Sequence, residues 1–431
     1  MRFSTLSQWL AWQEQLHPKA IDLGLERLRR TLSALGWRPP QCPVVTVAGT
    51  NGKGSTVALL TRILSAADYR VGTFTSPHLI RYNERVAIGE REISDASLIA
   101  AFERIDRARG KETLTFFEIN TLAALLIFET AAPDALVLEV GMGGRLDAVN
   151  VVDPDVSIIT SIALDHCDWL GSDVETIGVE KAGILRPHRP AIFGERQMPH
   201  SIAEVASSLG APLHRLGVEF DWVRRGEAWD WSHQALGTFE SLPNPALAGE
   251  AQFDNAAAVL ASLAMLRDRL TVSRDAIETG LRTVALPGRF QRLQCGAEGG
   301  AEWVLDVAHN PAAAKTLAQS LAKLPPQDPR IAVCGVLGDK DLRGIVAELK
   351  GSFDAWIVAG LPGPRALGPA MLSQRLRDEG ARVIAECADV RSACELASHT
   401  AGAQGRVVVF GSFLTVGPAL EWFDSRCVTL G

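Results

Sequence analysis

The sequence predicts an α/β protein of two domains: a parallel-sheet domain built around a phosphate-binding P-loop, then a smaller Rossmann-like α/β domain. Three observations support this. Short β-branched runs alternate with helical patterns, a glycine-rich loop joins the first such run to a helix, and the alternation resumes after a break at residues 286–288. Alternation of this kind is typical of parallel sheets with helices on both faces.

Bulk composition fits a globular protein too long for one core. The chain has 431 residues, whereas a single hydrophobic core stops growing near ~250–300 residues. Hydrophobic residues make up 47% of the chain and charged residues 22%, which is typical of globular proteins. The formal net charge is −7, without a long basic run, so nucleic acid is not an expected partner.

Location and assembly are predicted from patterns that the sequence lacks. No apolar run reaches the ~20 residues that span a bilayer, and residues 3–15 form an amphipathic stretch rather than a signal peptide. The seven cysteines are scattered without zinc-site or disulfide spacing, which indicates reduced thiols. We expect a cytoplasmic protein with no membrane partner and, since no heptad or self-association face is evident, a monomer.

The first domain is predicted to extend over residues 1–288. Strands are expected at residues 44–48, 135–140 and 156–160, and helices at 55–67 and 174–185. Residues 213–239 are Trp-rich short segments between turns, which favour small antiparallel strands in an excursion from this domain. Helices at 252–270 and 274–284 follow, and the helix breakers Pro287 and Gly288 mark the boundary.

The second domain is predicted to extend over residues 289–431. Strands are expected at 303–307, 331–334, 356–359, 382–385 and 407–410, with helices beginning at 311, 342 and 415. In both domains, ligands are expected outside the carboxyl ends of the parallel strands.

The strand at residues 44–48 continues directly into a glycine-rich loop and an apolar helix. Glycines let backbone N–H groups turn towards phosphates, the helix N-terminus adds its positive dipole end, and Lys53 adds a charge. The loop departs from the standard Walker pattern, because Val47 stands at the position of the first glycine and Gly54 separates Lys53 from the hydroxyls. A glycine turn with a surface lysine would not require this strand, loop and helix order, so we predict a nucleotide phosphate site.

Two later strands end in side chains that suit a metal site. The strand at 135–139 ends in Glu139, where a carboxylate would meet magnesium beside the phosphates. The next strand leads to Asp165 and His166. Because Mg²⁺ prefers oxygen to imidazole, the local pattern favours Glu139 and leaves His166 open between a metal ligand and a surface residue.

Seven motifs, in order along the chain, resemble one family. They are GTNGKGST at 49–56, Ser-Pro-His at 76–78, EVGMGGRLDAVN at 139–150, LDH at 164–166, EKAGIL at 180–185, PGRFQ at 287–291 and DVAHNP at 306–311. The set resembles the folylpolyglutamate synthase and dihydrofolate synthase group of the Mur ligase superfamily. The resemblance extends over nearly the whole chain.

The resemblance implies a site for ATP and Mg²⁺. In this family the phosphate loop holds ATP, which here means Gly49, Thr50, Asn51, Gly52, Lys53, Gly54, Ser55 and Thr56. The family's adenine, phosphate and ribose contacts match Asn255, Arg289 and Asp306. Its magnesium ligands match Ser76, Glu139 and His166.

The resemblance also implies a pterin pocket and a set of reacting groups. The pterin-contacting segments match Thr115, Phe116, Phe117, Glu118, Leu146, Asp147 and Ala148. On local evidence alone, the two phenylalanines would be helix core. Lys181 matches a lysine that is often carbamylated in the family, a modification that needs a partly desolvated, neutral amine near cations; without the resemblance it would be a helix-surface lysine. The catalytic set is Lys53, Lys181, Arg289 and His309, with His309 a candidate general base.

The activity that the resemblance implies is ATP-dependent ligation of L-glutamate. Phosphoryl transfer converts an acceptor carboxylate into an acyl phosphate, and the glutamate amine then displaces phosphate. The acceptors are dihydropteroate, giving dihydrofolate, and tetrahydrofolates, giving folylpolyglutamate. Three alternatives stay open: a synthase for only one of these acceptors, a cell-wall ligase of the same superfamily, and an ATP-gated regulatory module. Cell-wall ligases usually carry an extra N-terminal domain, for which a loop beginning at Gly49 leaves little room.

Overall fold

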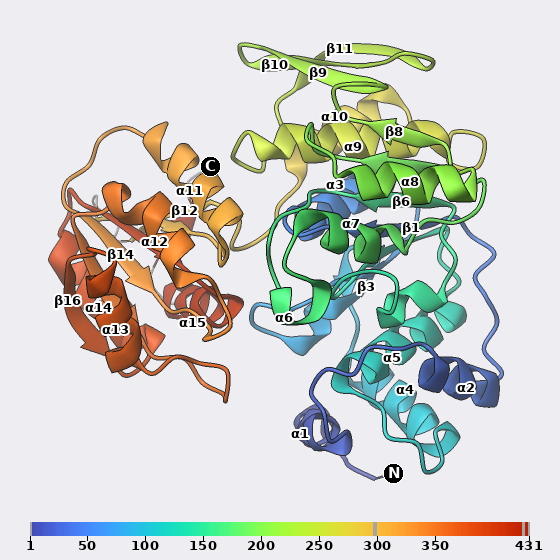
Figure 1. The fold of residues 1–431 in the computed structure, drawn as a ribbon, viewed down its shortest axis with the longest axis horizontal. Coiled ribbons are helices and arrows are strands. Elements are labelled where there is room, and N and C mark those ends of the chain that lie inside the picture. Colours follow the sequence, from blue (N-terminus) through green and yellow to red (C-terminus); the bar gives the residue numbers. More distant parts are fainter. Residues whose placement is uncertain (1, 296–299, 425–426, 430–431) are drawn as a thin grey trace. The chain divides into compact units, whose positions relative to one another are not determined.

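The structure is a computed structural model that describes residues 2–295, 300–424 and 427–429. The chain forms two compact units, each described here by itself (Figure 1). The first comprises the residues up to His78, then Tyr82–Ala246 and Gln252–Val284. The second comprises Leu79–Arg81, Leu247–Ala251 and the residues from Ala285 onward. Both units are α/β structures around largely parallel sheets, which confirms the predicted fold class.

The first unit is built on an eight-stranded sheet with the order β4-β3-β2-β5-β1-β6-β7-β8. Strands β2, β5, β1, β6, β7 and β8 are parallel, whereas β3 and β4 form an antiparallel edge. The strands are β1 (Val44–Ala48), β2 (Val71–Phe74), β3 (Val86–Ile88), β4 (Arg91–Glu92), β5 (Ala135–Glu139), β6 (Val156–Ile159), β7 (Ala191–Phe193) and β8 (Leu213–Arg215).

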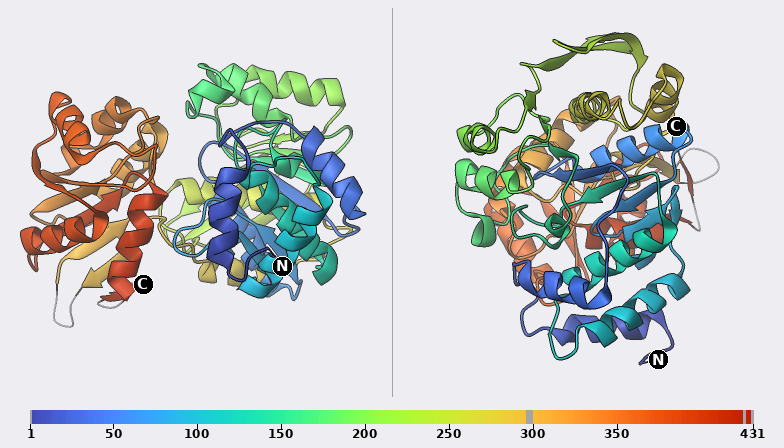
Figure 2. Two further views of the ribbon diagram at one scale, coloured as in Figure 1. Left: turned by 90° about the horizontal axis from the view of Figure 1, so that it is seen from below. Right: turned by 90° about the vertical axis from the view of Figure 1, so that its right-hand side faces the viewer.

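Helices surround this sheet in three groups (Figures 1 and 2). Helices α4 and α5 pack with α1 and α2, α3 packs with α10, and α7 packs with α8. The helices are α1 (Leu6–Leu16), α2 (Glu26–Leu35), α3 (Lys53–Ala66), α4 (Asp95–Ala108), α5 (Phe116–Ala131), α6 (Cys167–Leu170), α7 (Val174–Ala182), α8 (His200–Leu209), α9 (Ala251–Met265) and α10 (Arg274–Thr283), with the 3₁₀ turns η1 (Tyr82–Arg85) and η2 (Ala148–Val151).

A separate three-stranded antiparallel sheet forms the excursion expected from the Trp-rich segment. Its order is β11-β10-β9, with β9 (Phe220–Arg225), β10 (Ala228–His233) and β11 (Gly237–Pro243). The indole rings of Trp229 and Trp231 are buried, and their N–H groups donate to the backbone oxygens of Pro243 and Ala257. One part of the prediction was wrong, because β8 pairs in parallel with β7 and extends the main sheet.

The second unit contains a seven-stranded sheet with the order β16-β15-β14-β17-β13-β12-β18. Its central strands are parallel, and β12 and β18 add antiparallel pairs at one edge. The elements are β12 (Gln291–Cys295), β13 (Glu302–Leu305), α11 (Pro311–Ala322), β14 (Arg330–Cys334), α12 (Leu342–Leu349), η3 (Lys350–Ser352), β15 (Ala355–Ala359), α13 (Pro369–Asp378), β16 (Val383–Cys387), α14 (Val390–Ala401), β17 (Arg406–Phe410), α15 (Phe413–Asp424) and β18 (Cys427–Thr429).

The central strands of the second unit, β13, β14, β15 and β17, are buried on both faces, as a doubly wound sheet requires. In β17, Val408 and Phe410 belong to one hydrophobic core, whereas Val407 and Val409 belong to another. Successive side chains of a strand point to opposite faces, so the continuous apolar run at residues 407–410 supplies both cores.

Several element ends differ from the prediction. The expected helix at residues 252–270 ends at Met265, and the chain turns beyond it, where Arg269 contacts Asp155 and the backbone oxygen of Gln41. The helix expected to reach residue 185 ends at Ala182, followed by Gly183. Neither difference moves a predicted site residue to another element.

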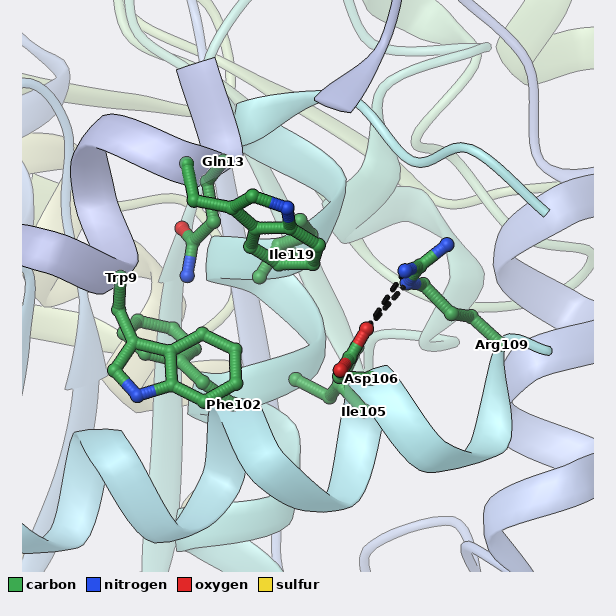
Figure 3. A pocket seen from close by; sticks show the side chains of 8 residues that line it. Trp9, Gln13, Phe102, Ile105, Asp106, Arg109 and Ile119 are labelled. Atoms are coloured by element: carbon green, nitrogen blue, oxygen red, sulfur yellow. Dashed lines mark hydrogen bonds and ion pairs between the residues drawn. The ribbon is translucent and has the colours of Figure 1, made fainter. Parts of the chain in front are cut away.

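Figure 3 shows a small pocket among α1, α4 and α5. The amide of Gln13 is buried there, and neither of its polar atoms has a hydrogen-bonding partner among the described residues. At the rim, Arg109 pairs with Asp106 at 2.7 Å. No predicted site residue lines this pocket. It is lined by Trp9, Trp12, Gln13, Phe102, Ile105, Asp106, Arg109 and Ile119.

Two further predictions concern the whole chain. In the part of the chain that the structure describes, no helix combines the length and apolar character needed to cross a bilayer. Five cysteines are described with free thiols, and the side chains of Cys295 and Cys427 lie outside the described residues. The five are Cys42, Cys167, Cys334, Cys387 and Cys394.

Candidate active site

The phosphate loop, residues 49–56, connects the end of β1 to the N-terminus of α3. Gly49 has a φ of 148°, and a Cβ there would lie 1.8 Å from Oγ1 of Thr160. Gly52 has a φ of 86°, and a Cβ there would lie 2.6 Å from Oδ1 of Asn255. Only glycine fits either position, because side chains rarely adopt this backbone conformation and no space exists for one. The loop therefore offers backbone and a helix N-terminus to an anion.

The carboxyl end of β6 holds the phosphate loop in place. Oγ1 of Thr160 donates to the backbone oxygen of Asn51 at 2.6 Å, and the backbone N–H of Asn51 donates to Oγ of Ser161 at 3.1 Å. The N–H of Thr50 donates to the backbone oxygen of Ser161 at 2.8 Å. The sequence analysis did not identify Thr160 or Ser161, because no local pattern shows that two strands' ends will meet.

Two lysines meet at the backbone oxygen of Gly49. Nζ of Lys53 donates to it at 3.0 Å and to the backbone oxygen of Thr50 at 3.1 Å. Nζ of Lys181, from α7, donates to the same oxygen at 2.8 Å. Lys181 is buried, and burial together with the charge of Lys53 lowers the pKa of Lys181 to about 7, against the opposing charges of Asp165 and Asp147. A large fraction of this amine is therefore neutral near pH 7.

Packing between two motifs positions Lys181. The backbone N–H of Arg145 donates to the backbone oxygen of Glu180 at 2.8 Å, and its guanidinium pairs with the Glu180 carboxylate at 2.7 Å. A Cβ on Gly144 would lie 2.6 Å from the backbone oxygen of Glu180, and one on Gly183 would lie 2.3 Å from Cβ of Arg145. These glycines allow the EVGMGGRLDAVN and EKAGIL motifs to pack in direct contact. The contact fixes the backbone position from which the Lys181 side chain extends.

The predicted magnesium ligands come from three strand ends. Glu139 is 5% exposed, and its Oε2 accepts the backbone N–H of Ser76 at 3.1 Å, so these two residues lie side by side. His166 has a φ of 53° and caps the start of α6. Within the described ranges, no three His, Cys, Asp or Glu side chains gather into a metal site by themselves. Mg²⁺ usually takes one or two protein oxygens and completes its shell with phosphates and water, so Glu139 and Ser76 fit it.

The first predicted pterin segment, residues 115–118, forms the start of α5 and is named the acceptor segment after that prediction. Oγ1 of Thr115 accepts the backbone N–H of Glu118 at 3.2 Å, and the Glu118 carboxylate accepts the backbone N–H of Thr115 at 2.7 Å. This is a reciprocal capping box. Phe116 and Phe117 are half-buried, and a Cβ on Gly141 would lie 2.5 Å from Cζ of Phe117. The ring of Phe117 therefore lies against the backbone two residues after Glu139.

An arginine of α2 that no local pattern signals contacts the acceptor segment. Nε of Arg27 donates to Oε1 of Glu118 at 3.2 Å, and its guanidinium also pairs with the Asp22 carboxylate. Arg27 therefore ties the chain before α2 to the start of α5. A single arginine in a helical pattern gives no signal of such a distant contact.

The second predicted pterin segment, residues 146–148, is organised by Asp147. Its carboxylate is buried and accepts the backbone N–H groups of Met142 and Val149, both at 2.9 Å. Burial raises the pKa of Asp147 to about 6, although these hydrogen bonds and the charge of Lys53 oppose the rise. Leu146 is half-buried and Ala148 is buried.

Arg85 is a buried cation beside residues of both the predicted metal site and the predicted pterin segment, and no local pattern in the sequence signals it. Nε of Arg85 donates to Nδ1 of His78 at 2.8 Å, and its guanidinium lies 5.6 Å from the ring centre of Tyr82 and 5.7 Å from that of Phe116. Burial and the charge of Arg85 lower the pKa of His78 to about 4. His78 is therefore neutral near pH 7, as its acceptor role requires.

The remaining predicted residues lie in two places. In the first unit, Asn255 accepts from Oγ1 of Thr56 at 3.3 Å and so contacts the end of the phosphate loop. In the second unit, the guanidinium of Arg289 lies 5.1 Å from the ring centre of Phe413, while Asp306 accepts the N–H of Phe290 at 2.8 Å. The ring of His309 also lies near Phe413, at 6.4 Å between centres. Arg289, Asp306 and His309 thus form one group around the carboxyl end of β13.

Matches to two known domain families define the class of protein to which the chain belongs. Residues 47–219 match the Mur ligase middle domain, and residues 288–413 match the Mur ligase glutamate ligase domain. The chain is thus an ATP-dependent ligase of the Mur type, which joins an acid to an amino acid.

Similar proteins narrow the class to one family. The dihydrofolate synthase/folylpolyglutamate synthase of Escherichia coli strain K12 is 45% identical over 423 residues, which cover 98% of this chain and 96% of that protein. The protein of the same description from Haemophilus influenzae is 38% identical over 428 residues, 96% of both chains. The chain belongs to the dihydrofolate synthase/folylpolyglutamate synthase family.

Solved structures agree in fold over nearly the whole length. The structure of E. coli FolC in complex with DHPP and ADP has a TM-score of 0.90 at 45% identity, covering 98% of each chain. A bifunctional folylpolyglutamate synthase/dihydrofolate synthase with Mn, AMPPNP and L-glutamate bound has a TM-score of 0.88 at 43% identity, again covering 98% of each chain.

Proposed function

We propose that this chain joins L-glutamate to dihydropteroate, giving dihydrofolate, and to tetrahydrofolates, giving folylpolyglutamate, at the expense of ATP. One observation carries the proposal. The end of β5 brings Glu139, which we propose as a magnesium ligand beside the phosphate loop, within two residues of Gly141, against which the ring of Phe117 packs. An acceptor held on that ring would have its carboxylate directed towards the nucleotide. The relatives named for both synthase activities support the choice of acceptors.

Phosphoryl transfer would activate the acceptor. A carboxylate is a poor electrophile, so one of its oxygens takes the γ-phosphoryl group of ATP and ADP leaves. The glutamate amine then attacks the acyl carbon, phosphate leaves, and the nitrogen loses a proton as the amide forms. Glu139, Ser76 and His166 would hold Mg²⁺, which would supply positive charge at the phosphates. Lys53 is the cation of the loop itself, and closure around the site would exclude water from the acyl phosphate.

Lys181 is proposed to be carbamylated. Its buried amine has a pKa near neutrality, so the nucleophilic form is available. The amine attacks carbon dioxide and loses a proton, which turns a buried cation into an anion beside Lys53. The replacement of a cation by an anion next to Lys53 removes the repulsion that lowers the pKa of Lys181. Intact-mass measurement in bicarbonate buffer, with and without Lys181→Met, tests this directly.

The second domain is proposed to supply the remaining groups. We assign residues 1–288 to the ATP- and pterin-binding domain and 289–431 to the glutamate-ligase domain, because the match to the latter family begins at residue 288. Arg289 would stabilise charge on the phosphates, Asp306 would hold the ribose, and His309 is the candidate base for the glutamate amine. Their grouping at one strand end supports a shared role.

The oligomeric state and the cellular location complete the proposal. We propose that the protein acts as a monomer in the cytoplasm, since all its substrates are small molecules and the described cysteines are free thiols. No nucleic acid or membrane is needed for the reaction.

The test supplies purified protein with ATP, Mg²⁺, L-glutamate and either dihydropteroate or a tetrahydrofolate. ADP release and product mass are followed together. The proposal requires one added glutamate on each acceptor. A product from only one acceptor would show that the protein is a synthase for that acceptor alone. ADP release without either product would contradict the proposal.

A further inference from the structure

Glu195 is a half-buried carboxylate at the carboxyl end of β7 that has no role in the reaction described above. Its Oε2 accepts the backbone N–H of Ile162 at 3.1 Å. Its other oxygen, Oε1, has no hydrogen-bonding partner among the described residues. The bond to Ile162 fixes the orientation of the carboxylate beside the end of β6, next to the residues that hold the phosphate loop.

The surroundings of Glu195 favour a hydrogen-bond donor rather than another acceptor. Asp254 lies close enough for its charge to raise the pKa of Glu195, in addition to the effect of burial. The neighbouring cation, Arg196, is paired with Asp221 at 2.6 Å and does not neutralise Glu195. An ionised carboxylate only accepts hydrogen bonds. A ligand that offers an N–H group at this position would relieve the repulsion.

The sheet order places Glu195 on the nucleoside side of the phosphate loop. The order β2-β5-β1-β6-β7 puts Ser76, which follows β2, and Glu139 and Gly141, at the end of β5, to one side of β1, whereas the third predicted metal ligand, His166, follows β6. The ring of Phe117 packs against Gly141, so the acceptor segment lies on the β5 side. Because the γ-phosphoryl group must face the acceptor, the nucleoside extends to the other side, over β6 and β7. Asn255, next to Asp254 in α9, contacts Thr56 there. Helix α9 also lies against β7, since a Cβ on Gly194 would lie 3.4 Å from Cβ of Ala258.

We propose that Glu195 determines the base specificity of the enzyme, by accepting a hydrogen bond from the exocyclic N6 amino group of adenine. This inference rests on the proposed function, since it assumes that ATP occupies the loop. The N6 amino group carries the only N–H donors of the adenine ring, so a carboxylate that reads this base must read that group. A base with oxygen at this position, such as hypoxanthine, would face Glu195 with an acceptor.

The test compares ATP with ITP in the full-length protein. We would measure kcat/KM for both nucleotides with a tetrahydrofolate and L-glutamate, and the Kd of ADP and IDP by calorimetry without acceptor. The variants are Glu195→Gln, which keeps the shape and the acceptor oxygen but adds an amide N–H donor, and Glu195→Ala. Glu240→Gln, an exposed position on β11, is the matched control. Thermal unfolding confirms that each variant is folded.

The wild-type protein and the control should prefer adenine over hypoxanthine roughly 10- to 100-fold, the range for one hydrogen bond to a charged group. Both Glu195 variants should reduce this ratio to about threefold or less. Glu195→Ala should do so mainly by lowering kcat/KM for ATP, and Glu195→Gln mainly by raising kcat/KM for ITP. An unchanged ratio in both variants overturns the inference. If the wild-type protein forms no amide, the proposed function fails. The ratio of the Kd of IDP to the Kd of ADP, compared between wild-type and variants, still decides the role of Glu195.

Discussion

The phosphate loop and the acceptor segment differ in what their polar groups do. In the phosphate loop, the motif presents backbone rather than side chains, because Gly49 and Gly52 have no room for a side chain. In the acceptor segment, the polar side chains of Thr115 and Glu118 bond to one another's backbone, and Glu118 also binds Arg27. A motif of glycines thus indicates a close approach of the backbone, which at Gly49 and Gly52 shapes the phosphate loop, whereas a motif of polar side chains first has to be checked against local structure.

The largest expected effect comes from the loop. Gly49→Ala would place a methyl group 1.8 Å from Oγ1 of Thr160, so the loop must move. We expect kcat/KM for ATP to fall by about 10²–10³-fold, as when a pre-organised charge-stabilising site is lost. Steady-state kinetics measure this. Gly351→Ala, where a Cβ meets nothing within 4 Å, is the control and should leave kcat/KM unchanged. A near-normal Gly49→Ala enzyme would refute the packing argument.

Lys181→Met separates activity from stability at the loop. We expect kcat to fall about 10²-fold or more, and the free energy of unfolding at pH 6 to rise by about 1–3 kcal/mol, since a buried cation is removed. The pKa of Lys181 falls from 10.5 in the unfolded chain to about 7, so between these values the unfolded state binds more protons. Wild-type stability therefore rises with pH across this window, and the advantage of the variant shrinks from pH 7 towards pH 10.5.

Denaturant unfolding of both proteins at several pH values measures that advantage. A variant that is less stable than wild-type at pH 6, or an advantage that does not change with pH, would contradict a lowered pKa for Lys181. The intact-mass measurement proposed above shows whether carbamylation contributes to the wild-type curve.

Phe117→Leu tests whether the acceptor segment holds substrate through its rings. Losing the aromatic ring should raise KM for dihydropteroate and for tetrahydrofolate about three- to tenfold, because aromatic pairs contribute about 0.5–1.5 kcal/mol. KM for ATP should stay unchanged. Phe128→Leu, a buried position in the same helix, controls for general weakening of α5. Equal effects of the two variants on acceptor KM would remove Phe117 from the pocket.

Thr115→Ala should have the smallest effect on catalysis. It removes one half of the capping box, so the free energy of unfolding should fall by about 1 kcal/mol, with less than a twofold change in acceptor KM. Ser273→Ala, which removes the corresponding cap of α10, provides a comparison for stability. A tenfold rise in acceptor KM without loss of stability would mean that Thr115 contacts the substrate, and would weaken the contrast between the two regions.

Local sequence order predicted the fold and the loop well. The strand, glycine loop and helix at residues 44–66 form one continuous local pattern, and Glu139 ends β5 as expected. Thr160 and Arg27 were missed because each acts on a partner far away in sequence. Arg85 was missed because its contact with His78, seven residues away, follows no helical or strand periodicity. Strand β8 was assigned to the wrong sheet, since a three-residue strand carries no signal of its pairing. The roles assigned to the predicted site residues stay predictions.

The most direct test of the central claim follows an oxygen atom. Dihydropteroate or tetrahydrofolate labelled with oxygen-18 in the reacting carboxylate is incubated with the protein, ATP, Mg²⁺ and L-glutamate, and the released phosphate is analysed by mass spectrometry. If ATP activates the acceptor as an acyl phosphate, each phosphate carries one labelled oxygen from the carboxylate. Unlabelled phosphate alongside amide product would contradict the mechanism.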